Sequence, residues 1–152
     1  MVHPPGQKSA GGKGQAASLT IIRICVGMFI FFFGFDKAWW LLDSTPLLTQ
    51  LSSWLTDAPP ISRWYLERMM PGAPVFARVL PSGLMLGGFA LVLGFWTRMA
   101  AALALLMVLS LQLAAGSMFR YPYLSDPGGL PVVGALVALI VGAGKLPLSL
   151  RN

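Results

Sequence analysis

Charged side chains are scarce in this sequence, and their scarcity excludes a water-soluble domain. Only 11% of the 152 residues are charged, whereas an ordinary soluble domain has about 25%. Hydrophobic residues make up 56% of the chain, and the mean hydropathy is +0.72. A soluble fold of this size cannot cover its surface with so few polar groups. The composition therefore excludes a soluble domain and a disordered chain, and it predicts an integral membrane protein.

Residues that carry enzyme chemistry are equally few. Cys25 is the only cysteine, which excludes a disulfide framework and a dithiol mechanism within the chain. His3 is the only histidine, so we expect no haem held by two histidines and no zinc site. Five acidic residues are too few for a calcium or di-iron site inside a bundle. We therefore expect no metal site, and any electrons must be carried by a partner or by a bound small molecule, for which a hydrophobic quinone is the candidate.

The charges that are present separate apolar blocks long enough to cross a bilayer. Nineteen uncharged residues lie between Arg78 and Arg98, and 21 lie between Arg98 and Arg120. Another 18 lie between Asp126 and Lys145. A bilayer core needs roughly 20 apolar residues in a helix. We expect an all-α membrane protein with four transmembrane helices, over about residues 18–42, 75–96, 98–119 and 128–148.

The first of these blocks is the least regular. Arg23 and Asp36 bound only 12 uncharged residues, but the apolar character continues outward to Leu19 and Leu42. Long basic side chains near a helix end reach the headgroup region. No small-residue cleavage site follows the block. We therefore expect a retained signal anchor here, not a cleaved signal peptide.

The N-terminal segment and the basic residues give the domain boundary and the orientation. Residues 1–17 are rich in Gly, Pro, Lys, Gln and Ser, which predicts a flexible cytoplasmic tail before a membrane domain over 18–152; the alternative is that a partner orders the tail. In the predicted topology, six basic residues lie on the membrane face that holds both termini, and five lie on the opposite face. The flank at Arg23 and the short turn at Arg98 favour both termini in the cytoplasm, at the inner membrane of a bacterium. No basic run with interleaved aromatics suggests nucleic-acid binding.

The long segment 43–74 predicts two short helices at the outer membrane surface. Thr45 followed by Pro46 is typical of a helix start, and the leucines and Trp54 that follow share one helical face. A second short helix is predicted over 61–70, between two proline-containing stretches. We interpret both as interfacial helices whose tryptophans and tyrosines form an aromatic belt. The alternative is a lid over a pocket between the transmembrane helices.

Small residues predict where the helices pack together, because close backbone approach drives helix association in lipid. Gly83 and Gly87 form a G-x-x-x-G pair, and Gly134 and Gly142 belong to a small-residue row on the last helix. On the first helix, one face carries five residues at steps of four, three, four and three, namely Arg23, Gly27, Ile30, Gly34 and Lys37. This glycine face should pack inward while carrying both basic residues.

Polar residues at membrane depth are the candidate site. Each has a structural alternative to ligand binding. Arg23 is either a headgroup anchor or a ligand-binding residue. Gln112 is either an interhelical hydrogen-bonding residue or a ligand-binding one. Asp36 and Lys37 form either a polar clamp with the outer loop or a site for the polar head of a ligand.

The order of these motifs resembles the DoxX/DoxD-like family of membrane proteins. The stretch RICVGMFIFFFGFDK, from Arg23 to Lys37, is similar to the family's opening helix. GGFALVLGFWTRMAA, residues 87–101, is similar to its second hairpin, and GAGKLPLSL, residues 142–150, is similar to its glycine-rich exit. The resemblance covers about 18–150. The sequence departs from the family pattern at residues 81–84, PSGL, where family members often have a glutamate.

The resemblance implies a four-helix membrane bundle and a range of functions. Family members of the DoxD type are membrane subunits of thiosulfate:quinone oxidoreductase, while others are linked to redox or thiol homeostasis or accompany the assembly of another protein. It implies structural or ligand-facing roles for the motif positions, namely Arg23, Gly27, Gly34, Lys37, Gly94 and Arg98.

Two interpretations of function follow. The first is an integral subunit of, or accessory to, a membrane redox complex, with a quinone or lipid bound in the bundle near Lys37. The second is a non-catalytic structural subunit or assembly factor that packs against other membrane protein subunits. A transporter is disfavoured because the sequence predicts neither broken helices nor paired charges at mid-membrane. Whether the protein is an enzyme is left open by the sequence.

Overall fold

The computed structural model describes residues 7–117 and 128–142, and in these parts of the chain the regular elements are helices joined by short turns, without strands. This confirms the all-α prediction. In chain order the elements are α1 (Gln7–Asp36), the 3₁₀ turn η1 (Ala38–Leu41), α2 (Thr45–Thr56), α3 (Pro60–Met69), the 3₁₀ turn η2 (Met70–Gly72), α4 (Ala73–Leu93), α5 (Thr97–Ala115) and α6 (Leu130–Gly142).

Three helical stretches are long and apolar enough to cross a membrane, as expected of a multi-pass membrane protein. They are Gly14–Asp36, a window within Pro60–Leu93, and Thr97–Ala115. In the second, η2 separates α3 from the more apolar α4. The described part of α6 is apolar but has only 13 residues. The predicted fourth span continues to residue 148, beyond the described residues, so a fourth crossing remains a prediction.

The boundaries of α1 differ from those predicted for the first span. The helix begins at Gln7, within the segment predicted as a tail, and it passes residue 18 without a break; the domain boundary there stays a prediction. At its other end α1 stops at Asp36, not at residue 42. The Lys37 amide donates to the Gly34 carbonyl (3.1 Å), which tightens the backbone into η1. This turn carries Trp40 into a buried position, and burial of the indole explains why the straight helix ends early.

The turn between α4 and α5 is short and tightly determined. Gly94 ends α4 in the left-handed conformation, and the Phe95 amide donates to the Ala90 carbonyl (2.9 Å), as in a Schellman motif. Trp96 also has a positive φ of 45°, which costs a residue with a side chain about 1–2 kcal/mol. Its ring stacks on Phe95, with ring centroids 5.6 Å apart. The turn sends α5 back along the bundle.

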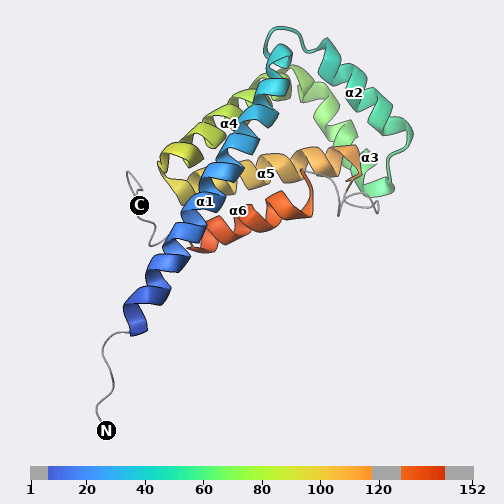
Figure 1. The fold of residues 1–152 in the computed structure, drawn as a ribbon. Coiled ribbons are helices and arrows are strands. Elements are labelled where there is room, and N and C mark those ends of the chain that lie inside the picture. Colours follow the sequence, from blue (N-terminus) through green and yellow to red (C-terminus); the bar gives the residue numbers. More distant parts are fainter. Residues whose placement is uncertain (1–6, 118–127, 143–152) are drawn as a thin grey trace.

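The long helices form a ring of contacts, in which α1 packs on α4, α4 on α5, α5 on α6, and α6 on α1 (Figure 1). The interface between α1 and α4 is the most extensive. The α2–α3 hairpin lies at one end of the ring, where α3 contacts α5 (Figure 1). A bundle core fills the ring, centred on fully buried side chains such as Ile30, Leu84, Leu91, Leu136 and Leu139.

A second cluster, the hairpin core, attaches the α2–α3 hairpin to the bundle. It is formed by the buried residues Trp40, Leu47, Leu51, Leu66, Met69, Ala73, Ala77 and Ala114. These come from η1, from both hairpin helices and from the adjoining ends of α4 and α5. The hairpin is therefore packed on the bundle through an apolar surface of its own.

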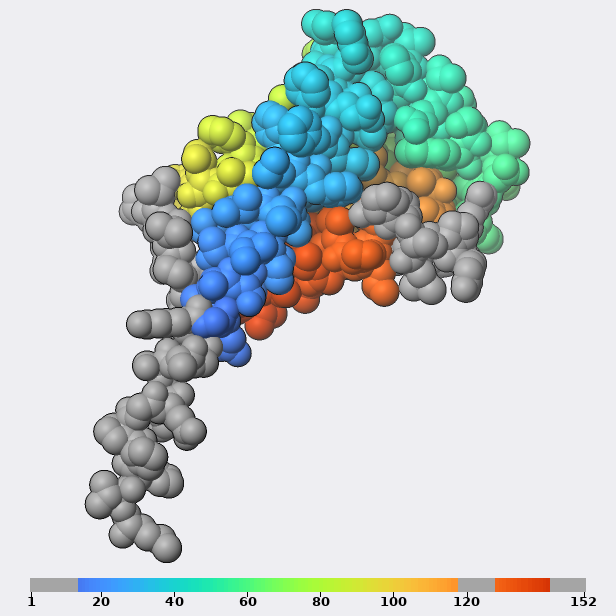
Figure 2. All heavy atoms as spheres, in the orientation of Figure 1, coloured from blue at the N-terminus to red at the C-terminus, as the bar shows by residue number. Residues whose placement is uncertain are grey.

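The outward face of α1 is apolar, as a lipid-facing surface must be. Figure 2 shows α1 along one side of the molecule. Large apolar side chains on it are 38–74% exposed at steps of three and four residues through α1 and η1, namely Ile21, Ile24, Met28, Phe32, Phe35 and Trp39. Two polar residues near its start are bonded within the helix: Ser18 donates to the Gly14 carbonyl and Thr20 to the Ala16 carbonyl.

Candidate functional site

Lys37 and Asp36 lie together where α1 ends, in a group that we call the Lys37 clamp (Phe33, Asp36, Lys37 and Trp40). The Lys37 ammonium lies 3.3 Å from Asp36 Oδ2, 4.4 Å from the centroid of the Phe33 ring and 5.5 Å from that of Trp40. The Lys37 side chain is 17% exposed, whereas that of Asp36 is 79% exposed. The aromatic rings thus hold most of the cation out of solvent, and Asp36 faces outward beside it.

Local sequence explains this geometry. Phe33 and Lys37 are four residues apart, which places them on one face at the end of α1. Trp40 reaches the same ammonium because η1 bends the chain back, with the Trp40 amide bonded to the Lys37 carbonyl (3.0 Å). A cation over two aromatic rings gains about 0.5–2 kcal/mol, more than the exposed contact with Asp36 contributes. The spacing from Phe33 to Lys37 is visible in the sequence, but the contribution of Trp40 is not, because it depends on the turn.

Gln112 lies at the far end of α5 and links it to the start of α6. Its side-chain amide nitrogen donates to the Gly128 carbonyl, and Ser117 Oγ donates to the Gln112 main-chain carbonyl at 3.2 Å. The residue is 7% exposed, and its Oε1 atom has no partner among the described residues. The amide therefore forms the interhelical bond that is one of the two roles expected for it.

Arg98 lies at the opposite end of α5, in the first turn. Its Nε atom donates to the Ile140 carbonyl at 3.0 Å, in the last described turn of α6. Arg98 thereby fixes the end of α6 against the start of α5.

Arg23 is buried in α1, with only 2% of its surface exposed. It is fourteen positions before Lys37 on α1, so the two lie roughly 21 Å apart along the helix. Arg98 and Gln112 are separated by the same number of positions on α5. The five residues predicted to bind a ligand therefore do not form one site. Asp36 and Lys37 are in contact.

The glycine face of α1 packs on α4. A Cβ atom added at Gly27 would lie 2.9–3.0 Å from atoms of Gly88, Leu91 and Val92, and one added at Gly34 would lie 2.8 Å from Leu84 Cβ. Gly88, which sequence analysis did not single out, is the tightest position of this interface. A Cβ there would lie 2.5 Å from the Phe31 amide nitrogen.

The other glycines predicted to pack have differing surroundings. At Gly83 an added Cβ would meet only the flexible end of Met107, and at Gly142 it would meet the Leu19 side chain at 2.8 Å. At Gly87 the nearest atoms would be 3.9 Å away, an ordinary contact, and at Gly134 nothing lies within 4 Å. No described helix approaches Gly134 closely, because its face of α6 points away from the bundle.

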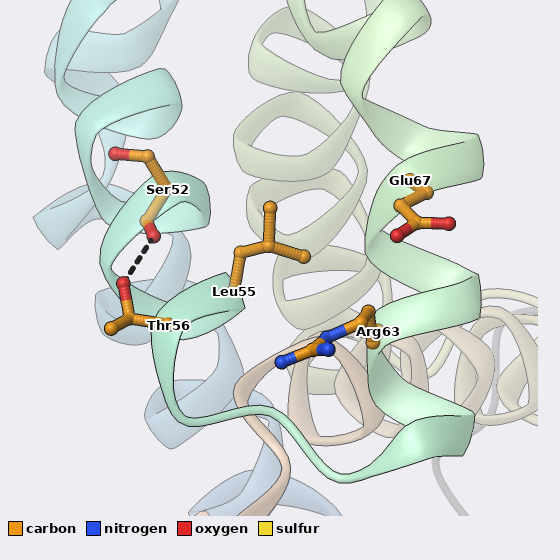
Figure 3. Close-up of a pocket in the computed structure, with 5 residues that line it drawn as sticks. All are labelled: Ser52, Leu55, Thr56, Arg63 and Glu67. Atoms are coloured by element: carbon orange, nitrogen blue, oxygen red, sulfur yellow. Dashed lines mark hydrogen bonds between the residues drawn. The ribbon is translucent and has the colours of Figure 1, made fainter.

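A hollow of about 380 Å³ opens between α2 and α3 (Figure 3). Its lining consists of Ser52, Leu55 and Thr56 from α2 and of Arg63 and Glu67 from α3. None of the predicted ligand-binding residues lines it. Sequence analysis placed both helices but not the hollow, since the hollow depends on how the hairpin closes.

Further polar groups are buried elsewhere in the described residues. Ser62 and Thr97 are 0% and 4% exposed, and neither hydroxyl has a partner within the described ranges. The same ranges contain no group of three or more His, Cys, Asp or Glu side chains placed to hold a metal ion. Cys25, the lone cysteine, is exposed on α1. Groups near one another that can bind a polar ligand are found in the Lys37 clamp and in the lining of the hollow.

The sequence matches one family of known proteins. A family model, DoxX, matches residues 18–117, which include most of α1 and all of the hairpin, α4 and α5. No curated protein and no solved structure matches the chain. The matched segment contains the Lys37 clamp and the Gly94–Arg98 turn, and it covers well over half of the sequence. The chain belongs to the DoxX family of membrane proteins.

Proposed function

We propose that this protein is an integral membrane subunit of, or accessory to, a membrane redox complex, and that the Lys37 clamp binds the polar head of a quinone or lipid. We also propose that it crosses the inner membrane of a bacterium four times, with both termini in the cytoplasm. The observation that carries the binding proposal is the position of the Lys37 ammonium. It is mostly buried between two aromatic rings at the end of a lipid-facing helix.

This arrangement suits an amphipathic ligand. The ammonium of Lys37 supplies hydrogen-bond donors for a quinone carbonyl or a lipid phosphate. The exposed apolar side chains of Phe32 and Phe35 lie on the same end of α1 and provide a surface along which an isoprenoid or acyl chain can lie. With one cysteine in the chain, the electrons of a redox reaction would be carried by the quinone or by a partner subunit, not by a dithiol.

Replacement of Lys37 tests the proposal. Purified protein in mild detergent is titrated with a short-chain ubiquinone analogue, and binding is followed by quenching of tryptophan fluorescence. We expect Lys37→Met to weaken binding about tenfold, as expected for the loss of one hydrogen bond to a charged group. Arg78→Met is the matched control, since Arg78 is an exposed cation at the same end of the bundle that is absent from the clamp. Absence of quinone binding by the wild-type protein would remove the quinone from the proposal.

The second candidate is a non-catalytic structural subunit or assembly factor. The wide apolar surface of the molecule favours it, because α4, α5 and α6 also expose large side chains such as Leu86, Leu106 and Val141. On this proposal Lys37→Met is tolerated in cells, whereas Gly83→Leu or Gly87→Leu abolishes co-purification with the partner complex. Mass spectrometry of proteins and small molecules that co-purify with the wild-type chain distinguishes the two candidates directly.

A further inference from the structure

The hollow between α2 and α3 has the chemistry of a binding site and is separate from the Lys37 clamp. At about 380 Å³ it is within the size range of small-molecule pockets, roughly 300–1,000 Å³. Figure 3 shows Arg63 and Glu67 one turn apart on α3, with Arg63 reaching toward α2, Glu67 lying against α3 and Leu55 projecting between the two helices. Arg63 and Glu67 make no ion pair within the described residues, since the ion pair found there joins Lys37 and Asp36. Both charges are therefore available to a ligand.

The hydroxyl groups of the opposite wall are bonded within α2, and in Figure 3 they do not point toward α3. Thr56 Oγ1 donates its proton to the Ser52 carbonyl (3.3 Å), and Ser52 Oγ donates to the Thr49 carbonyl (2.8 Å). The charged groups of the lining are thus one fork of donors, the Arg63 guanidinium, and one acceptor group, the Glu67 carboxylate. They match a small zwitterion that has an anionic group at one end and a cation with several N–H donors at the other.

The hairpin also exposes apolar side chains beside the hollow. Ile61 and Trp64, which flank Arg63 on α3, are 60% and 64% exposed. Tryptophan at a membrane surface lies at the level of the headgroups. A ligand whose charged end enters the hollow therefore has an apolar surface next to it for acyl chains.

We propose that the α2–α3 hollow binds the ammonium–phosphate headgroup of a phospholipid with a primary amine, of the phosphatidylethanolamine type. The Arg63 guanidinium binds the phosphate, and the Glu67 carboxylate accepts hydrogen bonds from the ammonium. Leu55 projects from α2 between the two helices. A choline headgroup carries the same charges, but its trimethylated nitrogen has no hydrogen to donate, so the site should discriminate between the two lipids.

The test measures which lipid the protein retains. The full chain is reconstituted in nanodiscs that contain equal amounts of phosphatidylethanolamine and phosphatidylcholine with the same acyl chains, and retained lipids are counted by native mass spectrometry. We expect the wild-type protein to retain the ethanolamine lipid in about tenfold preference, the factor of one hydrogen bond to a charged group. Glu67→Gln should abolish the preference, and Arg63→Gln should reduce retention of both lipids.

Two control variants and a competitor make the result specific. Arg68→Gln and Asp57→Asn change exposed charges of the same hairpin that do not line the hollow, and they should retain the wild-type preference. Circular dichroism and the thermal midpoint check that each variant is folded. Equal retention of the two lipids by the wild type, or loss of the preference in the controls, overturns the proposal. The proposal is also overturned if an equal concentration of soluble phosphoethanolamine displaces the retained lipid. The free headgroup would then be sufficient for binding, and the occupant would not need to be a phospholipid.

Discussion

At the scale of single residues, Asp43 shows how one side chain fixes the start of the hairpin. Its Oδ1 atom accepts hydrogen bonds from the Thr45 hydroxyl (2.6 Å) and from the Thr45 amide (2.8 Å). Both bonds stabilise the ionised carboxylate, so the pKa of Asp43 lies below its ordinary value of 3.8. A pKa lowered by folding stabilises the fold at pH values above the unfolded pKa. This contribution is lost as the pH falls through the folded pKa.

We expect Thr45→Val to raise the pKa of Asp43 toward its ordinary value. The valine removes the hydroxyl, whose bond is the larger cause of the shift, and leaves the amide bond in place. Carbon-13 NMR of the aspartate carboxyl groups, followed as a function of pH, measures the change. Ser44→Ala is the control, since the Ser44 side chain makes no capping bond. An unchanged Asp43 titration in Thr45→Val would contradict the assignment.

The same turn shows where sequence analysis of single residues is limited. The Thr45–Pro46 pair correctly indicated a helix start, but Thr45 is the first helical residue and Asp43 supplies the accepting oxygen. Several polar residues in a row can each fill the capping position, and the sequence does not rank them. Similarly, Lys37 was recognised as a site candidate from its position on the glycine face. Its aromatic partner Trp40 became evident only once the bend at η1 was known.

At the scale of helices, the packing of α1 on α4 depends on register. The recurrence of Gly27 and Gly34 on one face of α1 follows from sequence alone. On α4 the sequence offers Gly83, Gly87 and Gly88, and helical spacing favours the first two as a pair. The structure instead brings Gly88 against Gly27 and Phe31, with Gly87 rotated away. The choice between neighbouring glycines depends on how α4 is turned about its axis, and that is determined by the whole ring of helices.

We expect Gly88→Ala to destabilise the protein and Gly87→Ala to leave it unchanged or slightly more stable. An added methyl group at Gly88 would meet backbone atoms of α1 at 2.5–2.8 Å, and overpacking of this kind costs about 1–3 kcal/mol. At Gly87 the same methyl group meets nothing closer than 3.9 Å, and alanine favours the helix over glycine. Thermal unfolding in detergent, followed by circular dichroism, measures both. Equal midpoints for the two variants would contradict the register of α4 described above.

At the scale of the whole molecule, the contacts at the helix ends determine the directions in which the long helices run. Arg98 joins the start of α5 to the end of α6, and Leu19 packs against Gly142 near that same end of α6. The opposite end of the bundle holds the Lys37 clamp, the α2–α3 hairpin and the bond from Gln112 to the start of α6. Successive long helices therefore run in alternating directions. If all four cross the membrane, an even number of crossings returns the chain to the side from which it began.

We expect labelling of introduced cysteines to show both termini on one face of the membrane and the hairpin on the other. In a Cys25→Ser background, single variants Lys8→Cys, Ser53→Cys and Arg151→Cys are treated with a membrane-impermeant maleimide. Spheroplasts should be labelled at position 53 alone, and inside-out vesicles at positions 8 and 151. Labelling of positions 8 and 151 from opposite faces would mean that one of the four helices does not cross. The Lys37 clamp and the hairpin hollow would still share one face, because the labelling of position 53 assigns that end of the bundle independently of α6.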